Sequence, residues 1–358
     1  ITKTTPVLGY LHRGIEKIAE HKTYHQFITL TDRLDYTSPF INNLAYVLAV
    51  EKLLELEVPL RAQYIRVMLS EITRIQSHLI WLGTHALDIG AMSPLLYTFR
   101  EREETLDMFE MVGGARMNPS YFRIGGLAAD LPEGFVEKVR AFCEDLPSRI
   151  EGYERLLTEN KIWISRTKDV GIISAEDGIE LGLSGPCLRG SGVEWDLRKA
   201  NPYSSYDHFD FDIPTGKAGD TYDRYLVRME EMRQSNRIIL QTLDKLPSGE
   251  INAYNPKVIS PLKEKVQENI ESLIMHFHLM TEGFNVPKGE AYASVESSKG
   301  ELGFYVVSDG SSKPHRIKIR TPSFVNMESL GTMVEGSMMS DIVSVIGSID
   351  ICLGEVDR

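Results

Sequence analysis

The chain alternates between long stretches with a helical repeat of apolar residues and shorter stretches that lack one. The clearest repeat begins after Pro59, where apolar residues recur at steps of three and four from Ile65 to Leu82 and predict a helix that ends near Gly90. The same spacing predicts further helices over residues 39–56, 93–113, 132–160, 220–246 and 261–281. Long helices therefore dominate the predicted fold.

Three short stretches near the end of the chain alternate apolar and polar residues, as strands with one buried face do. They cover residues 291–295, 303–307 and 315–319, and turn residues separate them at 298–300 and 309–310. This pattern predicts a small antiparallel sheet. The predicted fold class is mainly α, of the α+β kind, with a helical bundle core and a small antiparallel β-sheet.

The predicted elements divide the chain into three segments. Residues 1–37 form an N-terminal strand and loop segment, in which Ile1 begins the strand. Residues 38–284 form a helical domain with an irregular insert at 171–214 that is rich in Gly, Pro, Ser and Tyr. Residues 285–358 contain the sheet, followed by a C-terminal helix and tail. Because the sequence starts at Ile1 without a methionine, we expect the natural N-terminus to lie upstream.

Charge and composition exclude several classes of function. The formal net charge of -12, with no basic block, argues against nucleic acid as a partner, because phosphate binding draws on clustered Lys and Arg. No apolar run in the sequence is long enough to cross a bilayer. The three cysteines, Cys143, Cys187 and Cys352, form no CxxC pair, so we expect neither a disulfide framework nor a structural zinc site. A reducing compartment is the simplest interpretation.

Other patterns give weaker signals. His21 and His25 are four residues apart and could share a helical face, but no third ligand accompanies them, so metal binding is not expected. The glycines at 113–114 and 190–192 match neither a P-loop nor a dinucleotide motif, so we expect no direct nucleotide binding. The aromatic and acidic residues at 203–212 predict either a subunit contact or buried packing.

The two ends of the chain resemble the metal-binding ends of the [NiFe]-hydrogenase large subunit. In that family each end carries a Cys-x-x-Cys pair, because soft thiolates hold nickel and iron. Here Asp35 and Ser38 stand at the first pair of positions, and Cys352 and Glu355 stand at the second. One thiolate cannot assemble such a centre.

Further blocks carry the same resemblance in family-like order over nearly the whole chain. They are residues 9–14, 122–126, 188–192, 196–199, 300–303, 308–310 and 320–324. Each block is weak alone, but together they are specific. With its metal ligands replaced, the chain resembles the quinone-site subunit of respiratory complex I (NADH:quinone oxidoreductase), the D or 49-kDa type. The resemblance implies a helical bundle core like that of the [NiFe]-hydrogenase large subunit.

This resemblance implies a subunit of a proton-pumping, membrane-associated translocase of the respiratory chain, active only in the multisubunit complex. Quinone would be reduced to quinol between this chain and a neighbouring iron–sulfur subunit that holds the terminal [4Fe–4S] cluster, while this chain binds no metal. Other peripheral-arm subunits and a membrane-arm subunit at the quinone entry are the further expected partners. The expected location is peripheral, on the cytoplasmic face of the inner membrane or the equivalent matrix or stromal face. The electron donor stays open.

Tyr36 is the first candidate catalytic residue. In the family the matching tyrosine donates a hydrogen bond to a quinone carbonyl, and a phenol with a pKa of about 10 keeps its proton at neutral pH. The alternative is a loop tyrosine bonded to a backbone carbonyl. The resemblance further implies that Asp35, Ser38, Asp350 and Cys352 line the quinone-binding pocket, although an isolated cysteine is more often part of the core.

Asp88 is the second candidate catalytic residue, near the end of the long helix. The resemblance makes it the partner of a histidine in a mobile N-terminal hairpin, whose imidazole donates to the other side of the quinone. That histidine belongs to a Gly-Pro-x-His-Pro-x-x-His-Gly motif that this sequence lacks, so the second proton donor has no candidate here. The alternative is an aspartate that interacts with a neighbouring loop.

Arg33 and Asn118 are expected near the partner's iron–sulfur cluster. Arg33 matches an arginine that lies against the cluster, and an ion pair with Asp32 or Asp35 is the alternative. Many relatives carry a histidine at the position of Asn118, whereas an amide cannot titrate. We therefore expect a low-potential cluster and favour menaquinone or plastoquinone over ubiquinone. The alternative is that Asn118 caps the turn before Pro119 and another group accepts the proton.

Two other functions stand as alternatives. One is the large subunit of a membrane-bound [NiFe] hydrogenase-related complex, which the absence of the CxxC pairs disfavours. The other is a scaffold that has lost all chemistry. The retention of Arg33, Tyr36, Asp88 and Asp350 speaks against this second alternative.

Overall fold

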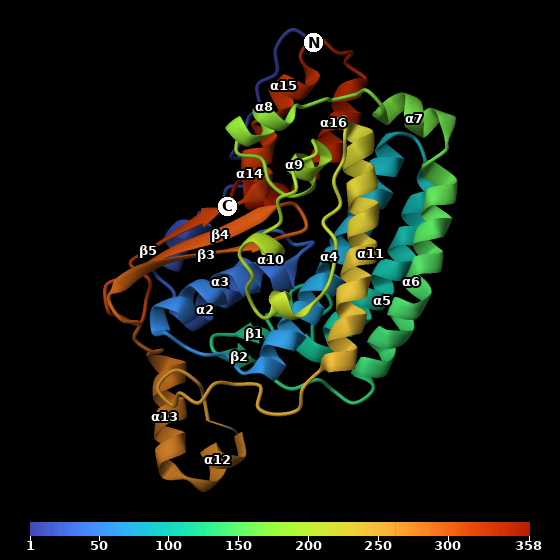
Figure 1. The fold of residues 1–358 in the computed structure, drawn as a ribbon. Coiled ribbons are helices and arrows are strands. Elements are labelled where there is room, and N and C mark those ends of the chain that lie inside the picture. The colour runs from blue at the N-terminus through green and yellow to red at the C-terminus, as the bar shows by residue number, and fades with distance from the viewer. Residues whose placement is uncertain (262) are drawn as a thin grey trace.

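The computed structural model describes residues 1–261 and 263–358. The body is a bundle of long helices with a small sheet on one side (Figure 1). The long helices are α3 (Pro39–Leu54), α4 (Leu60–Asp88), α5 (Met92–Gly113), α6 (Phe135–Leu157) and α11 (Thr221–Lys245). Their bounds confirm five predicted helices to within a few residues. The mainly α fold class with a small antiparallel sheet is confirmed as well.

The sixth predicted helix, over residues 261–281, was wrong as a single element. The structure has two helices there, α12 (Lys263–Glu268) and α13 (Ile270–Thr281), and residue 262 lies outside the described residues. Asn269 separates them, because its side chain accepts a hydrogen bond from the Glu271 amide at 2.8 Å and so starts a new helix. Both helices project from the body in Figure 1.

The predicted sheet is present and has three antiparallel strands in sequence order. They are β3 (Gly289–Glu296), β4 (Glu301–Ser308) and β5 (Arg316–Arg320). Glu296 pairs with Glu301 at the first turn, which leaves only four residues between the two strands. A second, smaller hairpin, β1 (Phe122–Arg123) with β2 (Gly126–Leu127), was not predicted because its strands are too short to show alternation.

The N-terminal strand expected at Ile1 was wrong. Residues 1–9 adopt neither helix nor strand, and two helices follow, α1 (Ile15–Ala19) and α2 (Tyr24–Thr31). The first residues bond to single groups near the C-terminus instead of to a strand: the Ile1 amine donates to the Ser337 carbonyl at 2.9 Å. The Gly9 and Leu11 amides donate to the Asp357 carboxylate. The division of the chain into three segments stays a prediction.

Short helices occupy most of the remaining chain. The insert at 171–214 contains several, and the end of the chain has four short helices where one was expected, since glycines and serines interrupt the pattern. These elements are α7 (Lys161–Thr167), α8 (Ala175–Glu180), α9 (Pro186–Gly190), α10 (Leu197–Ala200), η1 (Tyr206–His208), α14 (Pro322–Met327), α15 (Leu330–Val334), α16 (Asp341–Ile349) and α17 (Leu353–Val356). No described helix has the length and apolar character required to cross a membrane.

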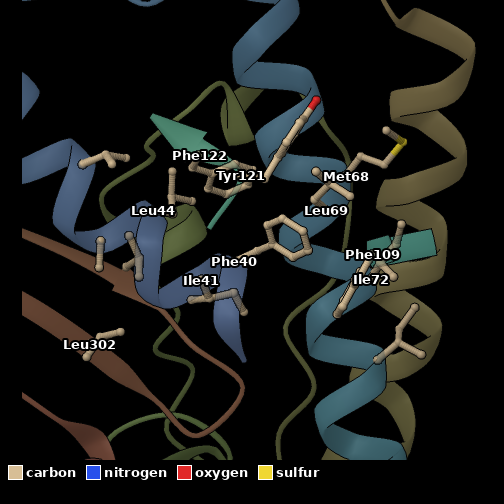
Figure 2. Close-up of a cluster of buried hydrophobic side chains, with 14 of the residues drawn as sticks. Phe40, Ile41, Leu44, Met68, Leu69, Ile72, Phe109, Tyr121, Phe122 and Leu302 are labelled. Atoms are coloured by element: carbon tan, nitrogen blue, oxygen red, sulfur yellow. The ribbon is translucent and has the colours of Figure 1, made fainter. Parts of the chain in front are cut away.

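A buried hydrophobic cluster fixes the start of α3 against α4 and α5 (Figure 2). Phe40, the second residue of α3, lies edge-on to Phe109 of α5 with ring centroids 4.8 Å apart. It also contacts Phe122 of β1, at 5.2 Å. Each of these aromatic rings is fully buried, which stabilises the fold by about 2 kcal/mol per side chain. The loop at 32–38, immediately before α3, is therefore attached to the rigid core.

The central helix α4 is unusual because it is buried on nearly all sides. It packs against both α5 and α11, and its polar residues are buried together with its apolar ones. Glu71, Arg74, Ser77 and His78 have almost no exposed surface. A buried charge is costly unless it has a partner, so the partners of these residues identify the polar centre of the molecule.

Candidate functional site

Three segments that are far apart in the sequence meet beside α4. They are the loop at 32–38, the β3–β4 loop at 297–300 and the chain after α16, residues 350–357. The Cys352 thiol lies 3.7 Å from the Leu34 carbonyl, which brings the two hydrogenase-like ends together as expected from the bundle. Lys299, from the β3–β4 loop, lies between them.

The ammonium group of Lys299 is the centre of this cluster. Its Nζ atom donates to Oδ2 of Asp35 at 2.9 Å and to the Thr37 hydroxyl at 2.9 Å. It also donates to the Ser77 hydroxyl of α4 at 3.2 Å. Oδ2 of Asp350 forms a longer ion pair with it, at 3.5 Å. We call these five residues the Lys299 cluster.

Serine hydroxyls continue the cluster into the protein. The Ser298 hydroxyl donates to that of Ser77 at 2.9 Å and lies 2.8 Å from the hydroxyl of Ser38. Ser38 is fully buried, so its hydroxyl supports the wall of the cluster from behind. The structure thus brings together Asp35, Ser38, Asp350 and Cys352, although the role predicted for them stays a prediction.

Opposite charges keep the Lys299 cluster ionised. Burial alone would raise the pKa of Asp35, but the Lys299 ammonium and the Thr37 hydroxyl hold that pKa below its usual range. Burial alone would lower the pKa of Lys299, and the carboxylates of Asp35 and Asp350 raise it well above the usual range instead. A positive charge is therefore held permanently at this position.

Tyr36 follows Asp35 directly in the chain, and its side chain is 45% exposed. The neighbouring Cys352 and partial burial raise the pKa of its phenol to about 12. The hydroxyl consequently keeps its proton at all physiological pH values and can donate a hydrogen bond. Within the described chain it donates to no backbone carbonyl, so the alternative of a loop tyrosine satisfied by such a carbonyl is not supported.

Glu355 stands where the hydrogenase family has its last cysteine. It is fully buried, and its Oε1 atom accepts a hydrogen bond from the Ser323 amide at 3.0 Å. Burial and the nearby Asp35 carboxylate raise the pKa of Glu355 to about 8. Burial also raises the pKa of the Cys352 thiol, which is therefore a neutral wall residue. This corner holds a neutral acid where the hydrogenase family has a metal thiolate.

Asp88 and Arg33 lie apart from the ion pairs of the cluster. Asp88 is the exposed last residue of α4, and its carboxylate has no hydrogen-bond or ion-pair partner in residues 1–261 and 263–358. Arg33 is exposed too, and over the same described ranges it pairs with neither Asp32 nor Asp35, contrary to the alternative. Asp32 bonds to Ser120 and Asp35 to Lys299.

Asn118 lies in the loop that the Asp32 carboxylate holds. Asp32 accepts from the Ser120 amide at 3.1 Å, which brings the loop of Arg33 and the loop of Asn118 side by side. The Asn118 side-chain oxygen is buried and has no hydrogen-bond partner in the described part of the chain, so it does not cap the turn before Pro119. The structure thus brings together the two loops that were expected near the partner's cluster.

The weaker candidates from the sequence occupy different kinds of structure. His21 lies in the turn between α1 and α2 while His25 lies within α2, so they do not share a helical face. Across residues 1–261 and 263–358, no group of three or more His, Cys, Asp or Glu is arranged to hold a metal ion. In the segment 203–212, Tyr206 and Phe211 are fully buried, which favours the packing interpretation.

A second polar cluster, which was not expected from the sequence, surrounds α4 beside the first. In this cluster Arg189 donates to Glu296 at 2.7 Å and to Glu231, and Arg198 donates to Asp196 at 2.6 Å. His78 contacts Glu231 at 2.8 Å. We call it the buried ion network; its members are Glu71, Arg74, His78, Arg189, Asp196, Arg198, Glu231 and Glu296. Its only sequence signal was the pair of blocks at 188–192 and 196–199.

Comparisons with known proteins agree on one family. The family model of the respiratory-chain NADH dehydrogenase 49 Kd subunit matches residues 88–358. Over its full length the chain is 58% identical to the D subunit of NADH-quinone oxidoreductase from Geotalea uraniireducens and 56% identical to that from Geobacter sulfurreducens, covering 92% of each. It is 56% identical to the D 2 subunit from Chloroflexus aurantiacus, covering 88% of that protein. These full-length similarities include all three segments that meet beside α4.

Proposed function

Because this chain belongs to the family of the 49-kDa subunit of respiratory-chain NADH dehydrogenase, we propose that the Lys299 cluster and Tyr36 form the wall of its quinone site. The family resemblance deduced from the sequence was correct, and the chain is a subunit of the quinone-reducing complex I. The alternative of a hydrogenase-type large subunit is not favoured. A permanently charged cluster beside an exposed hydrogen-bond donor argues against the other alternative, a scaffold that has lost all chemistry.

The observation that carries the proposal is an exposed phenol beside a buried positive charge. Tyr36 presents a protonated hydroxyl to the surface, and a quinone carbonyl is a suitable acceptor for it. Electrons that enter the quinone make its oxygens more negative, and the fixed charge of Lys299 stabilises that change without reorganisation. Asp35 and Asp350 orient the ammonium, while Ser38 and Cys352 complete the wall.

Reduction of a quinone to a quinol takes up two electrons and two protons, so a second donor is required opposite Tyr36. We assign to Asp88 the role of orienting the histidine that the family resemblance implies, whose motif is absent from residues 1–358. Its exposed carboxylate without a partner among the described residues fits this role.

The remaining assignments concern the complex as a whole. We propose that a neighbouring iron–sulfur subunit, holding the terminal [4Fe–4S] cluster, docks at the adjoining loops of Arg33 and Asn118. Other peripheral-arm subunits and a membrane-arm subunit at the quinone entry complete the surroundings of a translocase that is active only when assembled. The chain would then lie on the cytoplasmic face of the membrane or its equivalent. Asn118 favours menaquinone or plastoquinone as the substrate.

Substitution of Tyr36 by Phe in the intact complex tests the proposal. The variant removes one hydroxyl and retains the ring, so we expect quinone reduction to fall by about 10- to 100-fold. Transfer of electrons from NADH to a water-soluble acceptor that bypasses the quinone should be unchanged. Tyr254→Phe, at a tyrosine that is 98% exposed, is the matched control. Unchanged quinone reduction and inhibitor sensitivity in Tyr36→Phe would remove the main support for this site.

A further inference from the structure

The position of the Lys299 ammonium depends on a tight loop. Lys299 is the second of two residues between Ser297 and Gly300, whose backbones exchange hydrogen bonds of 2.7 and 3.3 Å. The Ser297 hydroxyl accepts from the Lys299 amide at 3.2 Å, and Asn326 donates to the Lys299 carbonyl at 3.1 Å. A shift of this loop moves the charged group directly.

Arg74 of α4 holds this loop from the helix side. Its guanidinium donates to the Ser297 carbonyl at 2.8 Å and to the Glu296 carbonyl at 2.6 Å. Its Nε atom donates to Glu71 at 3.2 Å, and the whole side chain is buried. A lysine at this position keeps the charge but cannot reproduce the planar fork that spans two carbonyls.

One face of α4 therefore fixes both ends of Lys299. Arg74 and Ser77 are three residues apart and lie on the same side of the helix. Arg74 holds the backbone of the Lys299 loop, whereas Ser77 accepts a hydrogen bond from the ammonium at the end of the side chain. Because α4 packs against α5 and α11, it provides a rigid reference for both contacts.

We propose that Arg74 is a positioning residue for quinone reduction, which acts by holding the Lys299 ammonium against Asp35. In the described part of the chain Arg74 pairs with neither carboxylate of the Lys299 cluster, and its effect passes through the β3–β4 loop. The inference rests on the proposed function, because it requires that Lys299 contributes to quinone reduction. It goes beyond that function by assigning a residue of the buried ion network to the reaction.

The test compares Arg74→Lys with Arg66→Lys in the assembled complex. Arg66 is a close match: it is fully buried on the same helix, donates to two carbonyls, those of Arg123 and Gly126, and pairs with Glu51. We expect Arg74→Lys to lower the rate of quinone reduction about tenfold and Arg66→Lys to change it less than about twofold. Similar losses in both variants would overturn the inference.

The pH profile separates positioning from a loss of packing. Lys299 holds Asp35 ionised, and the other titratable groups that act on this ion pair are Tyr36, Asp350, Cys352 and Glu355. A displaced ammonium should therefore move the acid limb of the rate profile to higher pH in Arg74→Lys, with no such shift in Arg66→Lys. An unchanged profile in Arg74→Lys would contradict the proposal.

The same substitution made in a Lys299→Gln variant distinguishes failure of this inference from failure of the proposed function. In Lys299→Gln, addition of Arg74→Lys should cause no further loss, since the group that Arg74 positions is gone. A further tenfold loss there would overturn the inference alone. If Lys299→Gln by itself leaves quinone reduction unchanged, the proposed function of the cluster fails instead.

A milder variant keeps the inference testable if Arg74→Lys does not assemble. Ser297→Ala deletes only the hydroxyl that accepts from the Lys299 amide. We expect about a threefold loss of quinone reduction in the otherwise unchanged complex and none in the Lys299→Gln background. An equal loss in both backgrounds, or no loss in either, would contradict the role of the loop.

Discussion

The buried ion network and the Lys299 cluster lie side by side along α4, and both pair buried cations with carboxylates, but they differ in their access to the surface. In the network, the guanidiniums of Arg74, Arg189 and Arg198 face four carboxylates, and every member is buried. In the Lys299 cluster, one ammonium faces two carboxylates, and the neighbouring Tyr36 is 45% exposed.

The difference shows which buried charges stabilise the fold and which are available for chemistry. Burial alone would raise the pKa of Glu231, but Arg189 and His78 hold it well below its usual range, and none of these groups is accessible. Lys299 is just as buried, yet it lies next to a surface donor. A fixed charge acts on a substrate only where the chain leaves an opening beside it.

The largest expected effect comes from removing a cation from the buried ion network. Arg189→Met leaves Glu231 and Glu296 without their main cation, and removal of one partner from a buried pair costs about 3–5 kcal/mol. We expect the variant to fail to assemble, measured as the amount of this subunit in the purified complex. Arg237→Met, which removes an exposed arginine paired with Asp210 and Asp212, should cost less than about 1 kcal/mol and assemble normally. Equal assembly of both variants would contradict a structural role for the network.

The next largest effect is expected in the Lys299 cluster. Lys299→Gln removes the fixed charge but leaves the network intact, so we expect the complex to assemble and quinone reduction to fall by about 100-fold. The measurement is the rate of quinone reduction beside the rate with an acceptor that bypasses the quinone. If assembly failed as it should in Arg189→Met, the Lys299 cluster would belong with the structural charges instead.

A smaller effect, on stability, should follow pH at Glu355. Its folded-state pKa of about 8 lies above the unfolded value of about 4.3, so the protonated form stabilises the fold below pH 4.3, and this contribution is lost as pH rises through about 8. Glu355→Gln keeps a neutral side chain of the same shape. From about pH 5 to pH 8 the free energy of unfolding of the variant should rise relative to that of the wild type, by up to about 1.4 kcal/mol for each pH unit. The measurement is the melting temperature of the two complexes at several pH values, and the difference between them should grow in the same direction. A constant difference across this range would show that Glu355 does not take up a proton on folding.

Much of the helical fold could be predicted because apolar periodicity is a local property. The five long helices and the three strands of the sheet follow from residues within one segment each. The break at Asn269 was missed because its side-chain cap competes with a strongly apolar pattern on either side. The short helices after Pro322 contain too few residues for a period to appear.

The site could be predicted only in part, because its contacts span the chain. The resemblance named Asp35, Ser38, Asp350 and Cys352, which the structure brings together. Lys299 was missed because a lysine in a hairpin turn normally points to solvent, and its partner Asp35 is 264 residues away in the sequence. The same holds for Arg74, whose carbonyl partners lie more than 200 residues further along.

The smallest expected effect concerns Asn118 and the buried Asp32, near the predicted position of the partner's iron–sulfur cluster. Asn118 cannot titrate, but burial raises the pKa of Asp32 to about 6, and Asp32 bonds to Ser120 in the loop of Asn118. We expect the potential of the terminal cluster to be nearly independent of pH in the wild type. Asn118→His should restore a slope of up to about 59 mV per pH unit, the one-electron value, in redox titrations of the complex at several pH values.

Asp32→Asn is the control that decides between the two residues. If Asn118 sets the behaviour, the wild type and Asp32→Asn give the same flat titration. A wild-type slope near about 59 mV per pH unit that disappears in Asp32→Asn would mean that Asp32 accepts the proton in place of a histidine. The preference for menaquinone or plastoquinone would then lose its basis, because a coupled proton raises the potential of the cluster at neutral pH. A fully buried carboxylate would then take part in electron transfer. Burial would therefore no longer separate the charges that stabilise the fold, as in the buried ion network, from those available for chemistry, as in the Lys299 cluster.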